Sequence, residues 1–206
     1  MDVKLDPPLA EAKMTPIVRD HLDRFGQVLQ VAWKDFQGLR QLAGSSLARA
    51  SAGTRAMLVT DFVRAPAHQL FAGVDGVSVE DRYGRPWVSL HGGRVQVRFK
   101  RLTASLRLCP TDTERQVRLA YHLGDPCLPG MPEATILTAG YVVDAGATAL
   151  AGTYLVCHVG DEPYYSIALP RSAPIACQLP LLPLSAPVIR STRTAVRKRL
   201  DRESGA

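Results

Sequence analysis

The chain lacks the sequence motifs that identify the common enzyme classes. It contains no G-x-S-x-G motif, no phosphate-binding P-loop and no G-x-G-x-x-G fingerprint. Its four cysteines are widely separated and form no C-x-x-C pair, and its five histidines show no H-x₃-H spacing. We therefore predict neither a metal nor a cofactor, and we interpret the cysteines as buried thiols.

Long apolar runs are also absent. No stretch approaches the roughly 20 apolar residues that a bilayer-spanning helix needs. The N-terminal segment has acidic residues and prolines where a signal peptide has an apolar run. We therefore expect a cytoplasmic protein without a membrane partner. The 206 residues, 46% of them hydrophobic, are enough for one domain with a substantial core.

The positive charge is concentrated near the C-terminus. Residues 186–206 hold six basic and two acidic residues, which account for +4 of the total net charge of +6. The rest of the chain is nearly neutral. A high isoelectric point alone therefore says little about a nucleic-acid interface on the folded body.

The first half of the chain has the periodicity of helices. Residues 1–15 are expected to be irregular, and apolar residues at three- and four-residue steps predict a helix over residues 16–50, with Gly44 as its end signal. A second helix is predicted from position 51 or 54 to position 71. Pro66 falls inside it, so we expect a kink or an early break there.

The period then changes to two, which is typical of strands. A helix with Thr111 as its N-cap is predicted over residues 109–124, and proline-rich residues 171–206 are predicted to form an extended strap and a basic tail. This order favours an α+β domain over residues 16–170, with the N-terminal helices and one central helix covering a mainly antiparallel sheet. The six predicted strands span residues 76–82, 85–91, 94–102, 135–145, 152–159 and 164–170.

One predicted strand has an apolar and a basic face. In "HGGRVQVRFKRL", residues 91–102, valine and phenylalanine alternate with arginine, glutamine and lysine. Residues two apart on a strand lie roughly 6.5–7 Å from each other on one face, a spacing that suits successive phosphates. The alternative is an ordinary solvated sheet face. The candidate residues for binding an anion or nucleic acid are Arg94, Arg98, Lys100, Arg101 and, at the following helix start, Thr111.

A catalytic interpretation of the same strand is a metal-dependent nuclease. Enzymes of the restriction-endonuclease type place an acidic residue on the second strand and E-x-K on the third, so that carboxylates hold Mg²⁺. Here the third strand carries Arg98 at the carboxylate position, followed by Lys100. Glu80 and Asp81 are the nearest acidic pair. With Lys100 they are weak catalytic candidates, because Glu80 and Asp81 are better explained as opening the turn after the first strand.

Several motifs together resemble a group of uncharacterised bacterial proteins. The motifs are "VQVRFKRL", "CPTDTERQ" and "TAGYVVDAGATALAGTYLVCHVGDEPYYSIALP", preceded by "AWKDF" and "TRAMLVTDFV". The resemblance covers roughly residues 16–170. This chain departs from the group at Tyr165, where tryptophan is common, and in its long proline-rich extension.

Proteins of that group are typically encoded beside a protein that joins a helix-turn-helix domain to a metallopeptidase-like domain. The resemblance implies a toxin-like protein of a bacterial toxin–antitoxin pair, whose partner is a DNA-binding antitoxin. It supplies no catalytic residues. The positions that recur in the group are Arg98, Lys100, Arg101, Pro110, Thr111, Tyr141 and Asp144.

Three functions therefore stay open at this stage. The first is a toxin-like protein that contacts RNA, DNA or a nucleotide through the basic strand. The second is a non-catalytic nucleic-acid-binding or adaptor protein that uses its C-terminal strap and tail. The third is a divergent metal-dependent nuclease.

Overall fold

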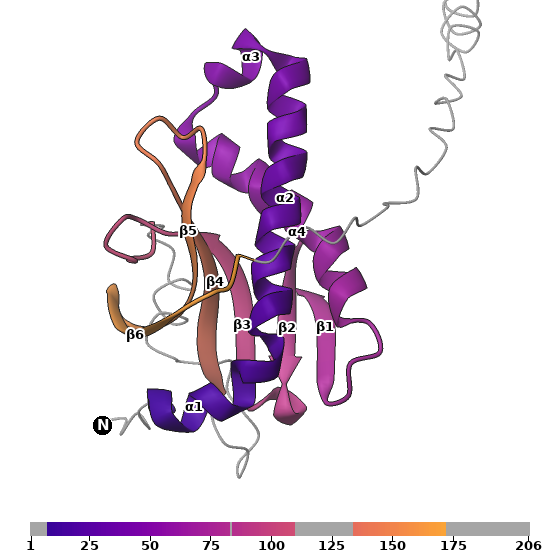
Figure 1. The fold of residues 1–206 in the computed structure, drawn as a ribbon, viewed down its shortest axis with the longest axis vertical. Coiled ribbons are helices and arrows are strands. Elements are labelled where there is room, and N and C mark those ends of the chain that lie inside the picture. The colour runs from indigo at the N-terminus through magenta and orange to yellow at the C-terminus, as the bar shows by residue number, and fades with distance from the viewer. Residues whose placement is uncertain (1–7, 83, 110–133, 172–206) are drawn as a thin grey trace, which may run out of the picture.

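A computed structural model describes residues 8–82, 84–109 and 134–171 of the chain. In this part of the chain, two long helices pack on one face of a six-stranded sheet (Figure 1). The predicted α+β fold is confirmed. The predicted central helix over residues 109–124 and the N-cap Thr111 lie outside the described residues, apart from position 109.

The N-terminal helical region is divided into several helices. The prediction of an irregular segment up to residue 15 is wrong, because α1 already begins at Glu11. Met14 and Val18 of α1 are fully buried and one helical turn apart, so their packing stabilises a helix that starts before Pro16. The helices are α1 (Glu11–Val18), the 3₁₀ turn η1 (Arg19–His21), α2 (Leu22–Ala43), α3 (Ser45–Ala48) and α4 (Ala52–Phe71).

The ends of α2 and α4 follow local sequence signals. Gly44 ends α2 in the left-handed region, with a φ of 51°, as its lack of a side chain allows. Ser51 caps α4, since its side-chain oxygen accepts a hydrogen bond from the backbone N–H of Thr54 at 3.0 Å. The early break expected at Pro66 does not occur. Pro66 is buried and α4 continues to Phe71, so packing against the sheet outweighs the missing backbone donor.

The sheet follows chain order from β1 to β6. All neighbouring strands are antiparallel except β3 and β4, which are parallel. The six strands are those predicted, with ends shifted by a few residues. They are β1 (Val77–Arg82), β2 (Arg85–Leu90), β3 (Val95–Arg101), β4 (Thr135–Val143), β5 (Leu150–Val159) and β6 (Glu162–Ala168).

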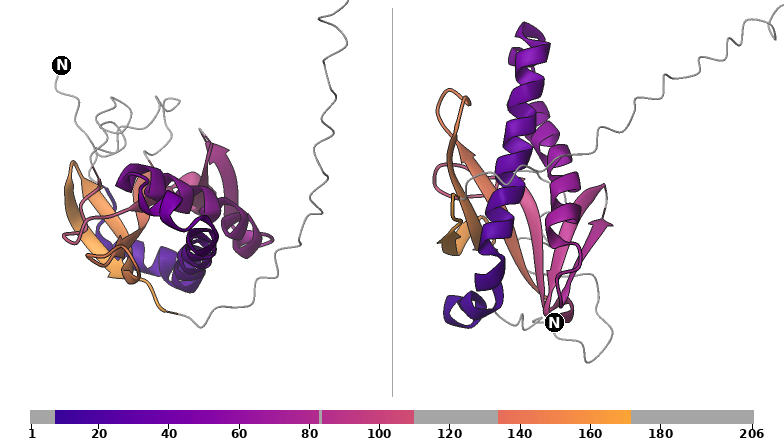
Figure 2. Two further views of the ribbon diagram at one scale, coloured as in Figure 1. Left: turned by 90° about the horizontal axis from the view of Figure 1, so that it is seen from above. Right: turned by 45° about the vertical axis from the view of Figure 1, so that its right-hand side comes forward.

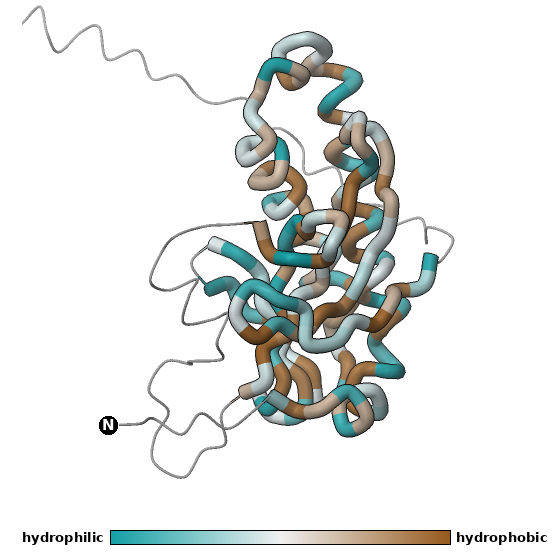
Figure 3. The backbone as a smooth tube through the Cα atoms, turned by 90° about the vertical axis from the view of Figure 1, so that its left-hand side faces the viewer, coloured by the Kyte–Doolittle hydropathy of each residue, from teal (hydrophilic) through white to brown (hydrophobic). Residues whose placement is uncertain are grey.

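The main core lies between the helices and one face of the sheet. Phe25 of α2 lies in the middle of it, with its ring 4.9 Å from that of Phe71 and 6.2 Å from that of Phe99 on β3. Figure 3 shows hydrophobic and hydrophilic segments interspersed along the helices and strands around this core. We call the side of the sheet that packs against α2 and α4 the helical face.

The other side of the sheet, which we call the open face, carries none of the described helices (Figure 2). Its apolar residues form a small cluster around Leu102, Val142 and Val156. Among the described helices, none is both long enough and apolar enough to cross a membrane. The described site residues that the sequence predicted lie partly on the helical face and partly on the open face.

Candidate anion-binding site

The candidate cations of β3 do not share one face. Arg98 and Lys100 alternate with the core residues Val97 and Phe99, so they lie on the open face. Arg101 falls on the helical face, beside its parallel partner Tyr141. Arg101, which the sequence places at the end of the row formed by Arg94, Arg98 and Lys100, is therefore separated from Arg98 and Lys100 by the alternation.

Arg94 also lies outside this arrangement. It precedes β3 and has helical backbone angles, with φ −64° and ψ −27°. Its carbonyl accepts a hydrogen bond from the N–H of Thr135 at 2.9 Å, and its side chain is exposed. Two of the predicted cations, Arg98 and Lys100, thus remain as candidates on one face of the strand.

A third cation joins them from the neighbouring strand. In the β2–β3 register Trp87 lies opposite Arg98, so Arg85, two residues before Trp87, projects from the same face beside Lys100. Arg85 is exposed and acts electrostatically on both Arg98 and Lys100. We call Arg85, Arg98 and Lys100 the basic cluster.

The basic cluster holds positive charges together against repulsion. Burial, followed by the charges of Arg98 and Arg85, lowers the pKa of Lys100 to about 8. Burial and then the charge of Arg85 lower the pKa of Arg98 to about 10. Groups whose pKa is displaced by burial and by like charges are often functional. This arrangement suits a bound anion, which would favour the charged form of each side chain.

Arg98 is not on a solvated surface. Only 5% of the residue is exposed, and its Nε donates a hydrogen bond to Oγ1 of Thr138 on β4 at 3.2 Å. The alternative of an ordinary solvated sheet face therefore does not hold at Arg98. The sequence alternation gave the correct face for Arg98, but it does not reveal whether that face is covered. Lys100 is partly buried, so the cluster ranges from the buried Arg98 to the exposed Arg85.

A neutralised arginine borders the basic cluster on β1. The guanidinium of Arg82 donates to Oε2 of Glu80 at 2.9 and 3.1 Å and to Oε1 of Gln96 at 3.1 Å. Its central carbon lies 5.9 Å from the ring centroid of Trp87, within the range of a cation–π contact. Arg82 thus links β1 to β3 across the open face. Its charge is already paired with Glu80.

Sequence reasoning missed Arg85. The signal was present in "EDRYGRPW", where a tight turn joins two strands and brings Arg82 opposite Arg85. Extending that register by one strand places Arg85 next to Lys100. Pairing the first three predicted strands through their connecting turns is therefore enough to place Arg85 beside Lys100.

The residues of the nuclease interpretation are not brought together. Glu80 lies on the open face with Arg82. Asp81 points to the other side, where its carboxylate lies 3.5 Å from Arg64 Nε and 3.4 Å from His68 Nε2 of α4. Within residues 8–82, 84–109 and 134–171, no group of three or more histidine, cysteine, aspartate or glutamate residues is arranged to hold a metal ion. The described geometry thus gives the nuclease interpretation no support.

Two positions from the family resemblance have structural roles. Tyr141 is buried on the helical face, with its ring 6.1 Å from that of Trp33, and burial raises the pKa of its hydroxyl. Asp144 accepts hydrogen bonds from Thr148 N at 2.6 Å and Ala149 N at 3.0 Å in the β4–β5 turn. Hydrogen bonds from Thr148 and Ala149 lower the pKa of Asp144. Pro110 and Thr111 lie outside the described residues.

Comparison of the chain with protein-family models, with curated proteins and with solved structures found no match. The functional interpretation therefore depends on the basic cluster and on the sequence resemblance.

Proposed function

We propose that this chain is the toxin-like protein of a bacterial toxin–antitoxin pair, and that its basic cluster binds a phosphate group of a nucleotide or nucleic acid. The partner is then an antitoxin with a DNA-binding domain. The pairing with an antitoxin follows from the sequence resemblance. The phosphate site follows from the geometry of Arg85, Arg98 and Lys100.

The observation that supports the phosphate site is the convergence of Arg85, Arg98 and Lys100 on the open face, where burial and the neighbouring charges lower the pKa of Lys100 to about 8. Folding partly removes its ammonium from water, which is the larger effect, and brings it beside two guanidinium groups, and both effects disfavour its charged form. A phosphate group offsets both effects, because its negative charge counters the repulsion and its charge-assisted hydrogen bonds replace lost hydration. A phosphate group at this position therefore favours the charged forms of Arg98 and Lys100 together.

The burial of Arg98 favours a single phosphate group over a long nucleic-acid backbone. A protein that follows a nucleic-acid strand usually presents exposed cations in a groove. Here the cations lead from the exposed Arg85 through Lys100 to a residue that is only 5% exposed. This geometry suits a nucleotide, or a terminal phosphate of RNA or DNA, that enters beside Arg85.

A binding experiment tests the phosphate site. Titration with AMP and with a short single-stranded RNA should give about tenfold weaker binding for Arg85→Gln, the loss of one charge-assisted hydrogen bond. Arg85 is exposed, so this change should leave the fold intact. Arg94→Gln is the matched control, since Arg94 is also exposed but lies off the open face. Equal weakening by both changes would show nonspecific charge attraction and contradict the site.

A growth experiment tests the toxin–antitoxin assignment. Expression of the chain in bacteria should impair growth, and co-expression of the protein encoded next to it should restore growth. The Arg85→Gln variant should be less toxic at equal protein levels. Normal growth on expression of the unaltered chain, with no co-purifying partner, would contradict the assignment.

A further inference from the structure

The residues after β3 form a short flap across the open face. Leu102 and Leu108 pair in an isolated antiparallel bridge, and Thr103 N donates to Arg107 O at 3.0 Å. Thr103 Oγ1 also accepts a hydrogen bond from Arg107 N at 3.0 Å. We call residues 102–108 the flap. Its base follows directly on Lys100 and Arg101, so its position bears on the basic cluster.

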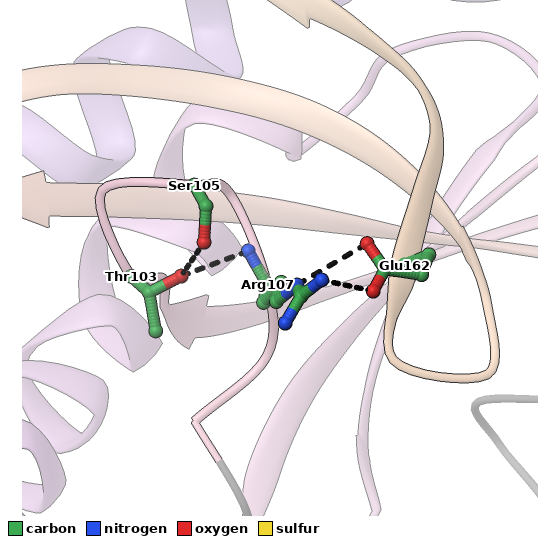
Figure 4. Close-up of polar contacts among 4 residues, drawn as sticks. All are labelled: Thr103, Ser105, Arg107 and Glu162. Carbon is green, nitrogen blue, oxygen red and sulfur yellow. Dashed lines mark hydrogen bonds and ion pairs between the residues drawn. The ribbon is translucent and has the colours of Figure 1, made fainter.

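The tip of the flap contacts β5 and β6 through two polar interactions, of which Figure 4 shows the one between Arg107 and Glu162. The buried His158 of β5 donates from Nε2 to the carbonyl oxygen of Leu106 at 2.8 Å. The guanidinium of Arg107 contacts both carboxylate oxygens of Glu162, with Nε 3.2 Å from Oε2. The side chains of this pair are 53% and 63% exposed. The ion pair between Arg107 and Glu162 is therefore a weak interaction.

The closed flap contains a strained residue. Leu106 has a φ of +60°, a left-handed conformation that residues with a β-carbon rarely adopt. Such a conformation persists only where surrounding contacts maintain it. The contacts of Thr103, His158 and Glu162 do so here. Weakening them should favour opening.

The underside of the flap covers an apolar patch next to the basic cluster. Its leucines pack on Val142, Val156 and Tyr154 of β4 and β5. Leu102 also occupies the space over Gly140, where a β-carbon would overlap its side chain. Gly140 is the register partner of Lys100 on one side and of Tyr154 on the other. Glycine in a strand often marks a place of close approach by another group.

We propose that the flap is an autoinhibitory lid, and that its opening exposes the apolar half of a nucleotide site whose phosphate half is the basic cluster. This inference depends on the proposed phosphate binding. Lys100 and Tyr154 lie two strands apart, roughly 10 Å, which is within the length of a nucleoside monophosphate. The phosphate contacts Lys100, and the base packs on Tyr154 and Val156 in place of the flap leucines.

The test compares two neighbouring carboxylates at the flap tip. Glu162→Gln removes the ion pair with Arg107. Asp161→Asn makes the same change in net charge at an exposed residue for which no ion pair is described. Apparent affinity is proportional to the open fraction, and an exposed ion pair is weak. Glu162→Gln should therefore bind AMP about two- to fivefold more tightly, whereas Asp161→Asn should be unchanged.

Inorganic phosphate distinguishes the two halves of the site. It lacks a base, so its affinity should change less than that of AMP in Glu162→Gln. Amide hydrogen exchange at Leu106 and Arg107 reports flap opening directly and should accelerate in this variant. A second variant, Thr103→Val, removes the hydrogen bond to Arg107 N and should have the same effects. Thr148→Val is the matched control, because it removes a threonine side-chain hydrogen bond from the β4–β5 turn instead of from the flap.

The outcomes separate this inference from the proposed function. Faster exchange at the flap without tighter AMP binding, in either Glu162→Gln or Thr103→Val, would overturn the lid. So would unchanged exchange in both variants. The proposed phosphate site would still stand after failure of the lid proposal if the unaltered protein bound phosphate and Arg85→Gln did not. If neither AMP nor phosphate bound any form of the protein, both proposals would fail.

Discussion

The two faces of the sheet use the same strands for different purposes. On the helical face, the odd-numbered residues of β3, such as Val97 and Phe99, are buried against α2 and α4. On the open face, the even-numbered residues include Arg98 and Lys100, which are also largely removed from water. Burial is thus shared by both faces. Polarity distinguishes them.

This difference indicates which residues serve stability and which serve another role. An apolar residue in a core stabilises the fold by leaving water. A buried cation beside other cations opposes folding, because it loses hydration and gains repulsion. The proposed phosphate binding gives the basic cluster a role apart from stability. Changes on the two faces should have opposite effects on stability.

The largest effect is expected on the helical face. Phe99→Ala should lower the free energy of unfolding by about 3–5 kcal/mol, the usual cost of a cavity left by a buried phenylalanine. Phe99 is 3% exposed and lies against Phe25. Urea denaturation followed by circular dichroism measures this loss. A loss below about 1 kcal/mol would contradict the assignment of Phe99 to the core.

The next change should stabilise the protein. The pKa of Lys100 is about 8 in the folded chain, below its usual 10.5, so the unfolded chain binds more protons between these values. The free energy of unfolding therefore rises with pH across that interval and is lowest below it. Lys100→Met removes this penalty and should stabilise the protein at pH 7 by roughly 1–3 kcal/mol.

Urea denaturation at pH 7 and at pH 10 tests this expectation. The gain from Lys100→Met should shrink at the higher pH, where Lys100 is neutral in the folded protein. The same variant should lose affinity for AMP. A destabilised variant, or a gain that grows with pH, would contradict the placement of Lys100 among like charges.

A smaller effect is expected on ligand affinity as the pH changes. The phosphate of AMP keeps its double charge between pH 7 and 9, because its second pKa is about 6. Lys100 is mostly charged at pH 7 and mostly neutral at pH 9, so AMP affinity should fall up to about tenfold over this range. Titration calorimetry measures the change. Lys100→Arg keeps its charge and should flatten the profile, whereas an equal fall in both proteins would exclude Lys100 as its cause.

Local features of this fold were predictable from the sequence. The period-two alternation predicted the first three strands, short apolar segments predicted the last three, and Gly44 marked the end of α2, because these signals depend on neighbouring residues. The start of α1 was not predicted, since it depends on burial of Met14 and Val18. The parallel pairing of β3 with β4 was not predicted either, because it joins residues that are distant in the chain.

The candidate site was predictable only in part. Alternation assigned Arg98 and Lys100 to one face, as the structure has them. It grouped Arg94 and Arg101 with them, because a pattern along one strand does not define where the strand begins or which neighbours it meets. Arg85 joined the site through the register of β2 with β3. The burial of Arg98 depends on tertiary packing, about which the sequence pattern gives no information.

The most direct test of the account is the pKa of Lys100 itself, measured by NMR of labelled lysine side chains with Lys100→Arg for assignment. We expect a pKa of about 8 for Lys100 in the free protein. Saturating AMP should raise it toward the usual 10.5, because bound phosphate favours the ammonium form. A pKa near 10.5 in the free protein, or one that AMP leaves unchanged, would contradict the claim that the basic cluster is built to bind an anion.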